Sequence, residues 1–210
     1  ATRSYATSGP GTSGGVWDGV SFKQAWSNNP AWMFWTLATD PDLGCGQEIG
    51  AAGCDRWTLY EIAQYCDQQV PDGFGGTEPR YSFNTWINVR DEALRVLQVL
   101  ATAFRGMTYW SAGQVTVRAD KPADPIKLVT PSNVVDGRFE YAGVSLRARH
   151  NLVKVRWRDP SLNYAEAVEV VQDAALIAEV GFIREAEVDG IGITSRGLAR
   201  RMARWLLYTE

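Results

Sequence analysis

The sequence is poor in the residues on which metal sites and nucleophilic catalysis depend. Its 210 residues include one histidine, His150, and three cysteines, at Cys45, Cys54 and Cys66. An odd number of cysteines without a Cys-x-x-Cys pair does not indicate a disulfide framework. One histidine among scattered cysteines does not indicate a zinc site either. We therefore expect free thiols, with no metal and no cofactor.

The chain also lacks a basic surplus and a long hydrophobic run. Its net charge is −3 at pH 7 and its pI is about 5.3, whereas proteins that bind nucleic acid usually carry a positive surplus. No run approaches the ~18 apolar residues of a membrane span, and no signal peptide is recognisable. We predict no specific nucleic-acid binding. The chain opens with Ala1-Thr2-Arg3 and closes within a helical pattern, so we expect a section of a longer polypeptide.

Aromatic residues, in contrast, are plentiful. The chain has nine tryptophans, eight tyrosines and seven phenylalanines, and its overall apolar content of 45% is that of a globular protein. Large aromatic side chains supply core area, and they also anchor protein–protein interfaces. This composition favours a role in packing or assembly.

Helices and strands are expected along most of the chain. Apolar periodicity, caps and alternation predict both kinds of element. The predicted helices are 31–38, 55–66, 90–105, 173–180 and 195–208. The predicted strands are 81–89, 107–110, 114–118, 139–144, 152–158 and 165–171. Because no steady βαβ rhythm appears, we predict the α+β class, with mixed antiparallel strands and several helices.

Composition also suggests how the chain is divided. The Gly/Ser/Thr-rich start predicts a flexible lead-in or linker over residues 1–19, and residues 20–210 form the folded module. Three prolines between Pro122 and Pro131 suggest a subdivision near residue 120. We expect residues 20–120 to be rich in helix, and residues 121–210 to be rich in strand with a C-terminal helix.

The stretch CDQQVPDGFGGTEPR, residues 66–80, combines glycines, prolines and carboxylates. It lacks the lysine and Ser/Thr of a phosphate-binding P-loop. Asp67, Asp72 and Glu78 could supply a carboxylate pair for acid–base catalysis, but a Gly/Pro-rich segment does not hold two carboxylates at a fixed separation. Pro71-Asp72-Gly73 is typical of a tight turn that needs a positive φ at glycine. We predict a shaped connector and no catalytic residue.

Arginines recur on the predicted last helix, at Arg196, Arg200, Arg201 and Arg204. They form either a solvated face paired with nearby acidic residues or a surface that grips an acidic partner. Ser195 precedes them as the predicted N-cap. The candidate protein-interface residues are Phe74, Arg80, Arg196, Arg200 and Arg204.

Several segments together carry a family resemblance. In order and spacing they are similar to the tip attachment, or host-specificity, proteins J of lambda-like long-tailed phages, over roughly residues 20–210. The segments are 26–32 (WSNNPAW), 50–52 (GAA), 64–68 (QYCDQ), 70–80 (VPDGFGGTEPR), 132–135 (SNVV), 149–151 (RHN), 159–160 (DP) and 194–197 (TSRG), followed by Trp205 and the final Thr209-Glu210.

The resemblance implies a structural component of a phage or prophage tail tip. Proteins of that family form a homotrimeric hub that closes the tail tube, and they contact other tail tip proteins. Their receptor-binding region, which meets the host outer membrane, would lie outside this chain. The implied fold is tail-hub-like, and the implied location is the virion tail tip, with host cytoplasm during assembly. No catalytic residue is implied.

Two alternatives stay open at this point. One is a tail-associated cell-wall hydrolase, and the other is a monomeric adaptor domain that binds other tail proteins. Under the hub hypothesis, the loop at 66–80 is a connector that lines a subunit interface and exposes Phe74.

Overall fold

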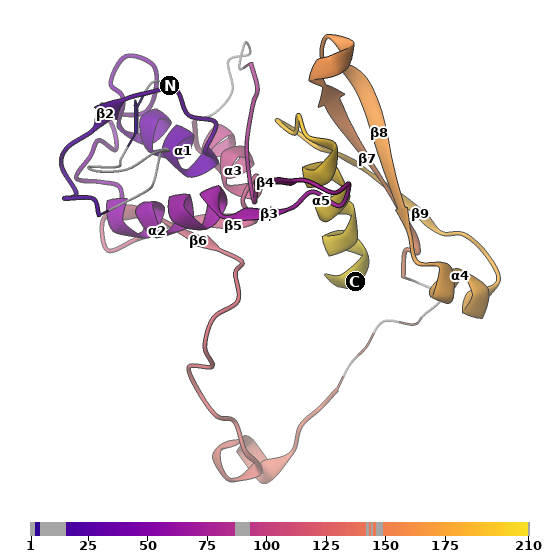
Figure 1. Ribbon diagram of the computed structural model, residues 1–210. Coiled ribbons are helices and arrows are strands. Elements are labelled where there is room, and N and C mark those ends of the chain that lie inside the picture. The colour runs from indigo at the N-terminus through magenta and orange to yellow at the C-terminus, as the bar shows by residue number, and fades with distance from the viewer. Residues whose placement is uncertain are drawn as a thin grey trace.

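The computed structural model describes residues 3–4, 16–86, 93–141, 143, 145 and 149–209 (Figure 1). Helices and small sheets alternate along the chain, which confirms the α+β class. The helices are α1 (Pro30–Thr39), α2 (Arg56–Asp67), α3 (Ala93–Thr102), α4 (Ala174–Val180) and α5 (Arg196–Thr209). The strands are β1 (Arg3–Ser4), β2 (Lys23–Gln24), β3 (Gln69–Pro71), β4 (Thr77–Pro79), β5 (Gly106–Ser111), β6 (Gln114–Ala119), β7 (Leu152–Asp159), β8 (Ala165–Gln172) and β9 (Glu185–Asp189).

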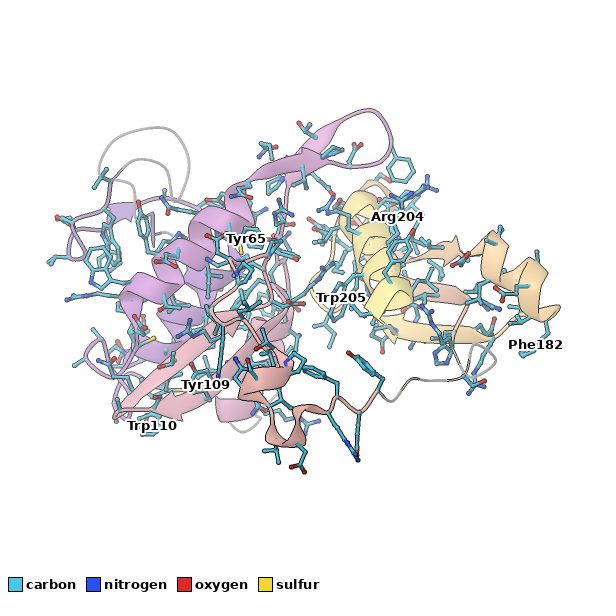
Figure 2. All side chains as sticks on the ribbon, turned by 90° about the horizontal axis from the view of Figure 1, so that it is seen from below. Tyr65, Tyr109, Trp110, Phe182, Arg204 and Trp205 are labelled. Atoms are coloured by element: carbon cyan, nitrogen blue, oxygen red, sulfur yellow. The ribbon has the colours of Figure 1, made fainter. Side chains whose placement is uncertain are left out.

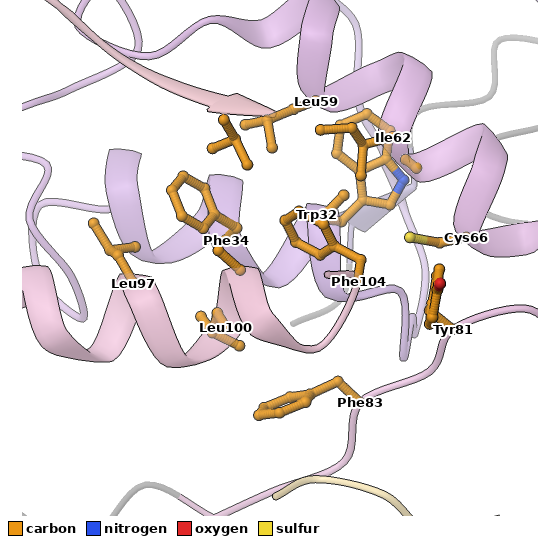
Figure 3. Close-up of a cluster of buried hydrophobic side chains, with 14 of the residues drawn as sticks. Trp32, Phe34, Leu59, Ile62, Cys66, Tyr81, Phe83, Leu97, Leu100 and Phe104 are labelled. Carbon is orange, nitrogen blue, oxygen red and sulfur yellow. The ribbon is translucent and has the colours of Figure 1, made fainter. Parts of the chain in front are cut away.

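Helices α1, α2 and α3 pack with the β5–β6 hairpin into a helical lobe, residues 16–119 (Figure 1). Helix α1 is apolar on nearly every side and is buried, as its sequence predicts. The lobe's core gathers aromatic and aliphatic side chains from all three helices and the segment after β4 (Figure 3). Its fully buried members include Trp32, Phe34, Leu59, Ile62, Phe83, Leu97, Leu100 and Phe104.

Asn29 fixes the start of α1 against α2. Its side-chain oxygen accepts a hydrogen bond from the Ala31 N–H at 3.1 Å, as an N-cap does. Its amide nitrogen donates to the Ala63 carbonyl at 2.9 Å and to Asp67 Oδ1 at 2.8 Å. The side chain is fully buried, so these bonds replace the water that it loses on folding.

A sheet lobe, residues 151–209, contains the strand order β8-β7-β9. Strands β7 and β8 are antiparallel, whereas β7 and β9 are parallel. Helix α5 packs against β7 and β8. The inward residues of β7 (Val153, Val155 and Trp157) are buried, and Lys154, Arg156 and Arg158 occupy the alternate positions. The sheet is therefore mixed, because β9 adds a parallel strand that the sequence did not reveal.

Two predicted strands are wrong where the structure describes them. Residues 81–86 of the predicted strand 81–89 are extended but belong to no sheet, and residues 87–89 lie outside the described residues. Tyr81 and Phe83 are buried in alternation, which imitates a strand, yet the Phe83 N–H bonds to the Asn28 carbonyl. In the predicted strand 139–144, residues 139–141 and 143 form no strand, and the other two lie outside the described part.

All five predicted helices are present in the structure, but their first and last residues differ from the predicted ones. Helix α3 is described from Ala93, and the predicted residues 90–92 lie outside the described part; a turn replaces the predicted helix at 103–105. Helix α2 is capped by Asp55, the first residue of the predicted helix 55–66, whose side chain accepts from the Thr58 N–H at 3.2 Å.

Residues 120–150 join the two lobes along the chain, and the described residues 120–141, which we call the arm, loop away from both lobes (Figure 1). The arm contains two short 3-10 turns, Pro131–Asn133 and Val135–Gly137. Whether the lobes are separate domains divided near residue 120 stays a prediction. Trp17, which the predicted lead-in includes, is buried in the core of the helical lobe.

Within the described residues, neither a membrane-crossing helix nor a group of three or more potential metal-binding side chains is found. The three cysteines are free thiols. Burial raises the pKa of the Cys54 thiol to about 12 and that of Cys66 well above its usual value. These two thiols therefore stay protonated and unreactive at neutral pH.

We expect Asn29→Ala to destabilise the helical lobe by about 1–3 kcal/mol, because it removes the cap and the buried hydrogen bonds from the Asn29 amide to the Ala63 carbonyl and Asp67. Urea unfolding followed by circular dichroism measures the change. Gln47→Ala, at an exposed position, is the matched control and should leave the midpoint nearly unchanged. An Asn29→Ala midpoint equal to that control would show that the buried amide contributes nothing.

Candidate protein interface: the hairpin docked on the last helix

Residues 69–79 form a short antiparallel hairpin, in which β3 pairs with β4 and Pro71 lies opposite Thr77. Asp72 shapes the loop, because its Oδ1 accepts hydrogen bonds from the Phe74 N–H at 2.7 Å and the Gly76 N–H at 2.9 Å. Gly73 and Gly75 have φ values of +83° and +99°, which confirms the predicted turn with glycine at positive φ. The loop is thus held in one shape, with Phe74 at its tip.

The tip residue Phe74 lies against two arginines of α5. The guanidinium carbons of Arg196 and Arg200 lie 4.4 and 5.2 Å from the centre of its ring, distances at which cations attract aromatic faces. Glu169 of β8 pairs with both arginines, at 2.8 Å from Arg196 Nε and 3.8 Å from Arg200 Nη1. These four residues form what we call the Phe74 clamp. The ring itself remains 46% exposed.

A second set of contacts anchors β4 to α5. Arg201 Nη1 donates to Glu78 Oε1, and its Nη2 donates to the carbonyls of Pro79, at 3.3 Å, and Arg80, at 3.0 Å. Ser195 Oγ donates to Glu78 Oε2 and accepts from the Leu198 N–H at 3.3 Å, which agrees with its predicted N-cap role. We call Arg201, Glu78 and Ser195 the Arg201 anchor. It ties the helical lobe to the first two turns of α5.

Gly197 lets the hairpin approach α5 closely. A Cβ atom at this position would lie 2.4 Å from Glu78 Oε1 and 2.9 Å from the Asp72 carbonyl oxygen. Both distances are shorter than a carbon atom tolerates, so a larger residue would displace the hairpin.

Arg105 makes a further contact between the lobes. Its guanidinium lies 4.6 Å from the centre of the Trp205 ring and 5.7 Å from that of Tyr81, and its Nη2 donates to the Arg201 carbonyl at 3.4 Å. Trp205 projects from α5 toward the helical lobe (Figure 2). The hairpin and Arg105 together hold α5 against the helical lobe.

The structure brings three of the five predicted interface residues together, namely Phe74, Arg196 and Arg200. Arg80 lies elsewhere, because its guanidinium stacks 4.5 Å from the Tyr65 ring and donates to Gln68 Oε1 at 3.2 Å. Arg204 is exposed on α5, one turn beyond Arg200, and lines a hollow of about 340 Å³.

Sequence reasoning missed the roles of Arg201, Glu78, Glu169 and Gly197. Only Glu169 carried a usable signal. It lies at an inward position of the alternating strand AEAVEVVQ, and an acid on the inward face of a strand implies a paired cation. The contact of Gly197 with the hairpin depends on a partner far away in sequence and had no local signal.

Two of the three carboxylates considered for catalysis, Asp72 and Glu78, are engaged in holding the loop, and the third, Asp67, accepts a hydrogen bond from Asn29. The backbone N–H groups of Phe74 and Gly76 lower the pKa of Asp72, whereas a general acid needs a raised pKa. Glu78 is bound by Ser195 and Arg201. This arrangement builds a rigid loop and gives no acid–base pair.

The fold and the site thus define an α+β module whose hairpin docks on its last helix. The profile of the Phage-tail_3 family, described as "Putative phage tail protein", matches residues 92–210. Tip attachment protein J of Escherichia phage SECphi27 is 39% identical over 93% of the chain and 16% of the relative. The protein of the same name from Escherichia phage SECphi4 is 36% identical over 95% of the chain and 17% of the relative. The chain belongs to this phage tail protein family and is a homologue of tip attachment protein J. It spans about a sixth of the length of these curated relatives.

We expect Gly197→Ala to loosen the hairpin and to destabilise the fold by about 1–3 kcal/mol, because overpacking outweighs the gain of up to about 1 kcal/mol from replacing glycine in a helix. Amide hydrogen exchange over residues 69–79, together with urea unfolding, measures both effects. Gly143→Ala, where an added Cβ meets nothing within 4 Å, is the control. Unchanged exchange in the hairpin of Gly197→Ala would contradict the close approach.

The loop should also depend on pH through Asp72. Because its pKa is lowered in the folded protein, the contribution of this carboxylate is present above its ordinary pKa of about 3.9 and is lost as the pH falls through the folded value. An NMR titration of the Phe74 and Gly76 amide signals should give a midpoint below about 3.9. Asp72→Asn should abolish the transition, and a midpoint at or above the ordinary value would refute the assignment.

Proposed function

We propose that the chain is a hub section of a phage or prophage tail tip, one that forms part of a homotrimer closing the tail tube. The similarity to two tip attachment proteins over more than nine-tenths of the chain supports this function most directly. Both relatives are about six times longer than the matched section, since the match covers 16% and 17% of their lengths. The receptor-binding region then belongs to other parts of the longer protein.

The surface of the chain supports an assembly role. Large aromatic side chains are exposed on both lobes, among them Trp26, Trp86, Trp110 and Tyr208. Exposed tryptophan and tyrosine are enriched where proteins meet other proteins. Among the described residues, no group of three or more potential metal-binding side chains lies near them.

Within this function, the Phe74 clamp is the proposed contact surface. Phe74 is presented by a rigid loop, so little conformational entropy would be lost when a partner covers it. The outer faces of Arg196 and Arg200 flank the ring, and Arg204 continues the basic surface along α5. This surface suits an acidic or aromatic patch on a second copy of the chain or on another tail tip protein. Arg80, whose guanidinium stacks on the Tyr65 ring, belongs to a separate contact.

Light scattering over a concentration series tests the proposal. We expect a trimer mass that appears as the concentration rises, and we expect Phe74→Ala to weaken association on the order of tenfold, as loss of an interface aromatic does. Phe182→Ala is the matched control, because Phe182 is 45% exposed against 46% for Phe74.

A monomer at every concentration, both for this chain and for the longer protein that contains it, would contradict the hub proposal and favour an adaptor that binds other tail proteins. If the chain trimerises and the Phe74→Ala and Phe182→Ala variants associate equally well, the clamp is not part of the interface, although the trimer proposal stands.

A further inference from the structure

The arm between the lobes exposes more apolar surface than an isolated protein usually leaves uncovered. Ile126 is 100% exposed, Leu128 80%, Val135 85% and Tyr141 92%. These side chains follow one another along a single extended segment that projects away from the body of the chain (Figure 1). A run of exposed apolar residues on one segment marks a surface that another molecule covers.

The arm is held in shape by its own contacts. At its base, the Asp120 N–H donates to the Arg105 carbonyl at 2.9 Å and Lys121 pairs with Glu61 at 3.6 Å. Beyond that point the described residues 122–141 form hydrogen bonds only with one another. Asn133 closes the tip, donating to the Leu128 carbonyl at 2.9 Å and accepting from the Thr130 N–H at 2.8 Å.

The middle of the arm has the composition of a β-strand, but in the described residues it belongs to no sheet. Residues 125–131 read PIKLVTP, with β-branched residues between two prolines, and the first six are extended without regular pairing. Such a segment satisfies its backbone groups when it adds to the edge of an existing sheet. The prolines limit the added strand to the residues between them.

The same chain offers an unpaired sheet edge. In the order β8-β7-β9, strand β8 is paired on one side only. On the sheet face away from α5, β7 carries lysine and arginine, and its neighbours pair with them: Lys154 with Glu185, Arg156 with Asp189 and Arg158 with Glu166. This ion-paired face is suited to water.

Only the β8 edge of that face is apolar. Val168 and Val170 are 50% and 49% exposed there. On the α5 side of β8 lies a hollow of about 340 Å³ whose lining is mostly polar and includes Gln172, Asp173 and Arg200. An added strand sends alternate side chains to the two faces, so Ile126 and Leu128 would cover Val168 and Val170, while Lys127 and Val129 would lie on the side of the polar hollow.

We propose that residues 126–129 of the arm add as a fourth strand to the free edge of β8 in a second copy of the chain. The donor and the acceptor belong to the same sequence, so each copy both gives and receives an arm, as a closed symmetric assembly requires. The arm of this chain points away from its own β8 (Figure 1), and its base is fixed by Arg105 and Glu61. The inference rests on the proposed self-association.

Photo-crosslinking from position 128 tests the proposal. A photoreactive amino acid replaces the exposed Leu128, and light and heavy isotope-labelled copies are mixed before irradiation. Mass spectrometry should then find crosslinks from position 128 to residues 165–172 in which one peptide is light and the other heavy. Crosslinks to β8 only within one copy, or to other elements, would overturn the exchange between copies.

A separate experiment tests the β8 edge by placing positive charges on it. Val168→Lys with Val170→Lys should weaken self-association on the order of tenfold, whereas Val20→Lys with Leu43→Lys, also at exposed apolar positions, should not. If the chain trimerises and neither pair has an effect, the arm proposal fails while the hub proposal stands. If no association occurs at any concentration and no mixed crosslink forms, both fail.

Discussion

The ion pair between Arg201 and Glu78 is the interaction on which the arrangement of the two lobes depends. The Arg201 guanidinium is mostly buried. It reaches from α5 to the Glu78 carboxylate and to two backbone carbonyls of the hairpin. Both side chains of the ion pair are about one-fifth exposed, so removing either would leave the other charge poorly solvated. The hairpin can sit this close because Gly197 has no side chain, and Ser195 completes the carboxylate's hydrogen bonds while capping α5. This contact therefore fixes the positions of the hairpin, α5 and the sheet behind α5 relative to one another.

This arrangement of hairpin, helix and sheet determines which surfaces the molecule exposes to partners. Because the anchor fixes the hairpin, Phe74 is presented between Arg196 and Arg200 in a single position, and Glu169 keeps both arginines in place from the sheet side. The ion pairs on β7 and β9 make most of the open sheet face hydrophilic, which leaves the β8 edge as its apolar part. The arm adds apolar surface that its own chain does not cover. A rigid body with a shaped tip, an apolar edge and a projecting arm is suited to building an assembly.

Much of the fold could be predicted from the sequence because its signals are local. The asparagine–proline start of α1, the leucines at every third position of α3 and the alternation of β7 are each patterns of neighbouring residues, and the corresponding elements form. Residues 81–86 show the limit of such signals. Tyr81 and Phe83 alternate as in a strand, but their backbone N–H groups bond to the carbonyls of Cys66, at the end of α2, and Asn28, before α1. In the candidate site, Phe74 and two arginines were predicted, whereas Arg201 and Gly197 act through partners about 120 residues away, which no local pattern reveals.

Electron cryomicroscopy of the tail tip of a phage whose tip protein contains this chain tests the central claim most directly. The account predicts three copies of this section around the tail axis, each with its hairpin docked on α5 and with α5 and the arm at contacts between subunits. A single copy per tail, or a copy bound at the outside of the tube with these surfaces facing solvent, would contradict the account.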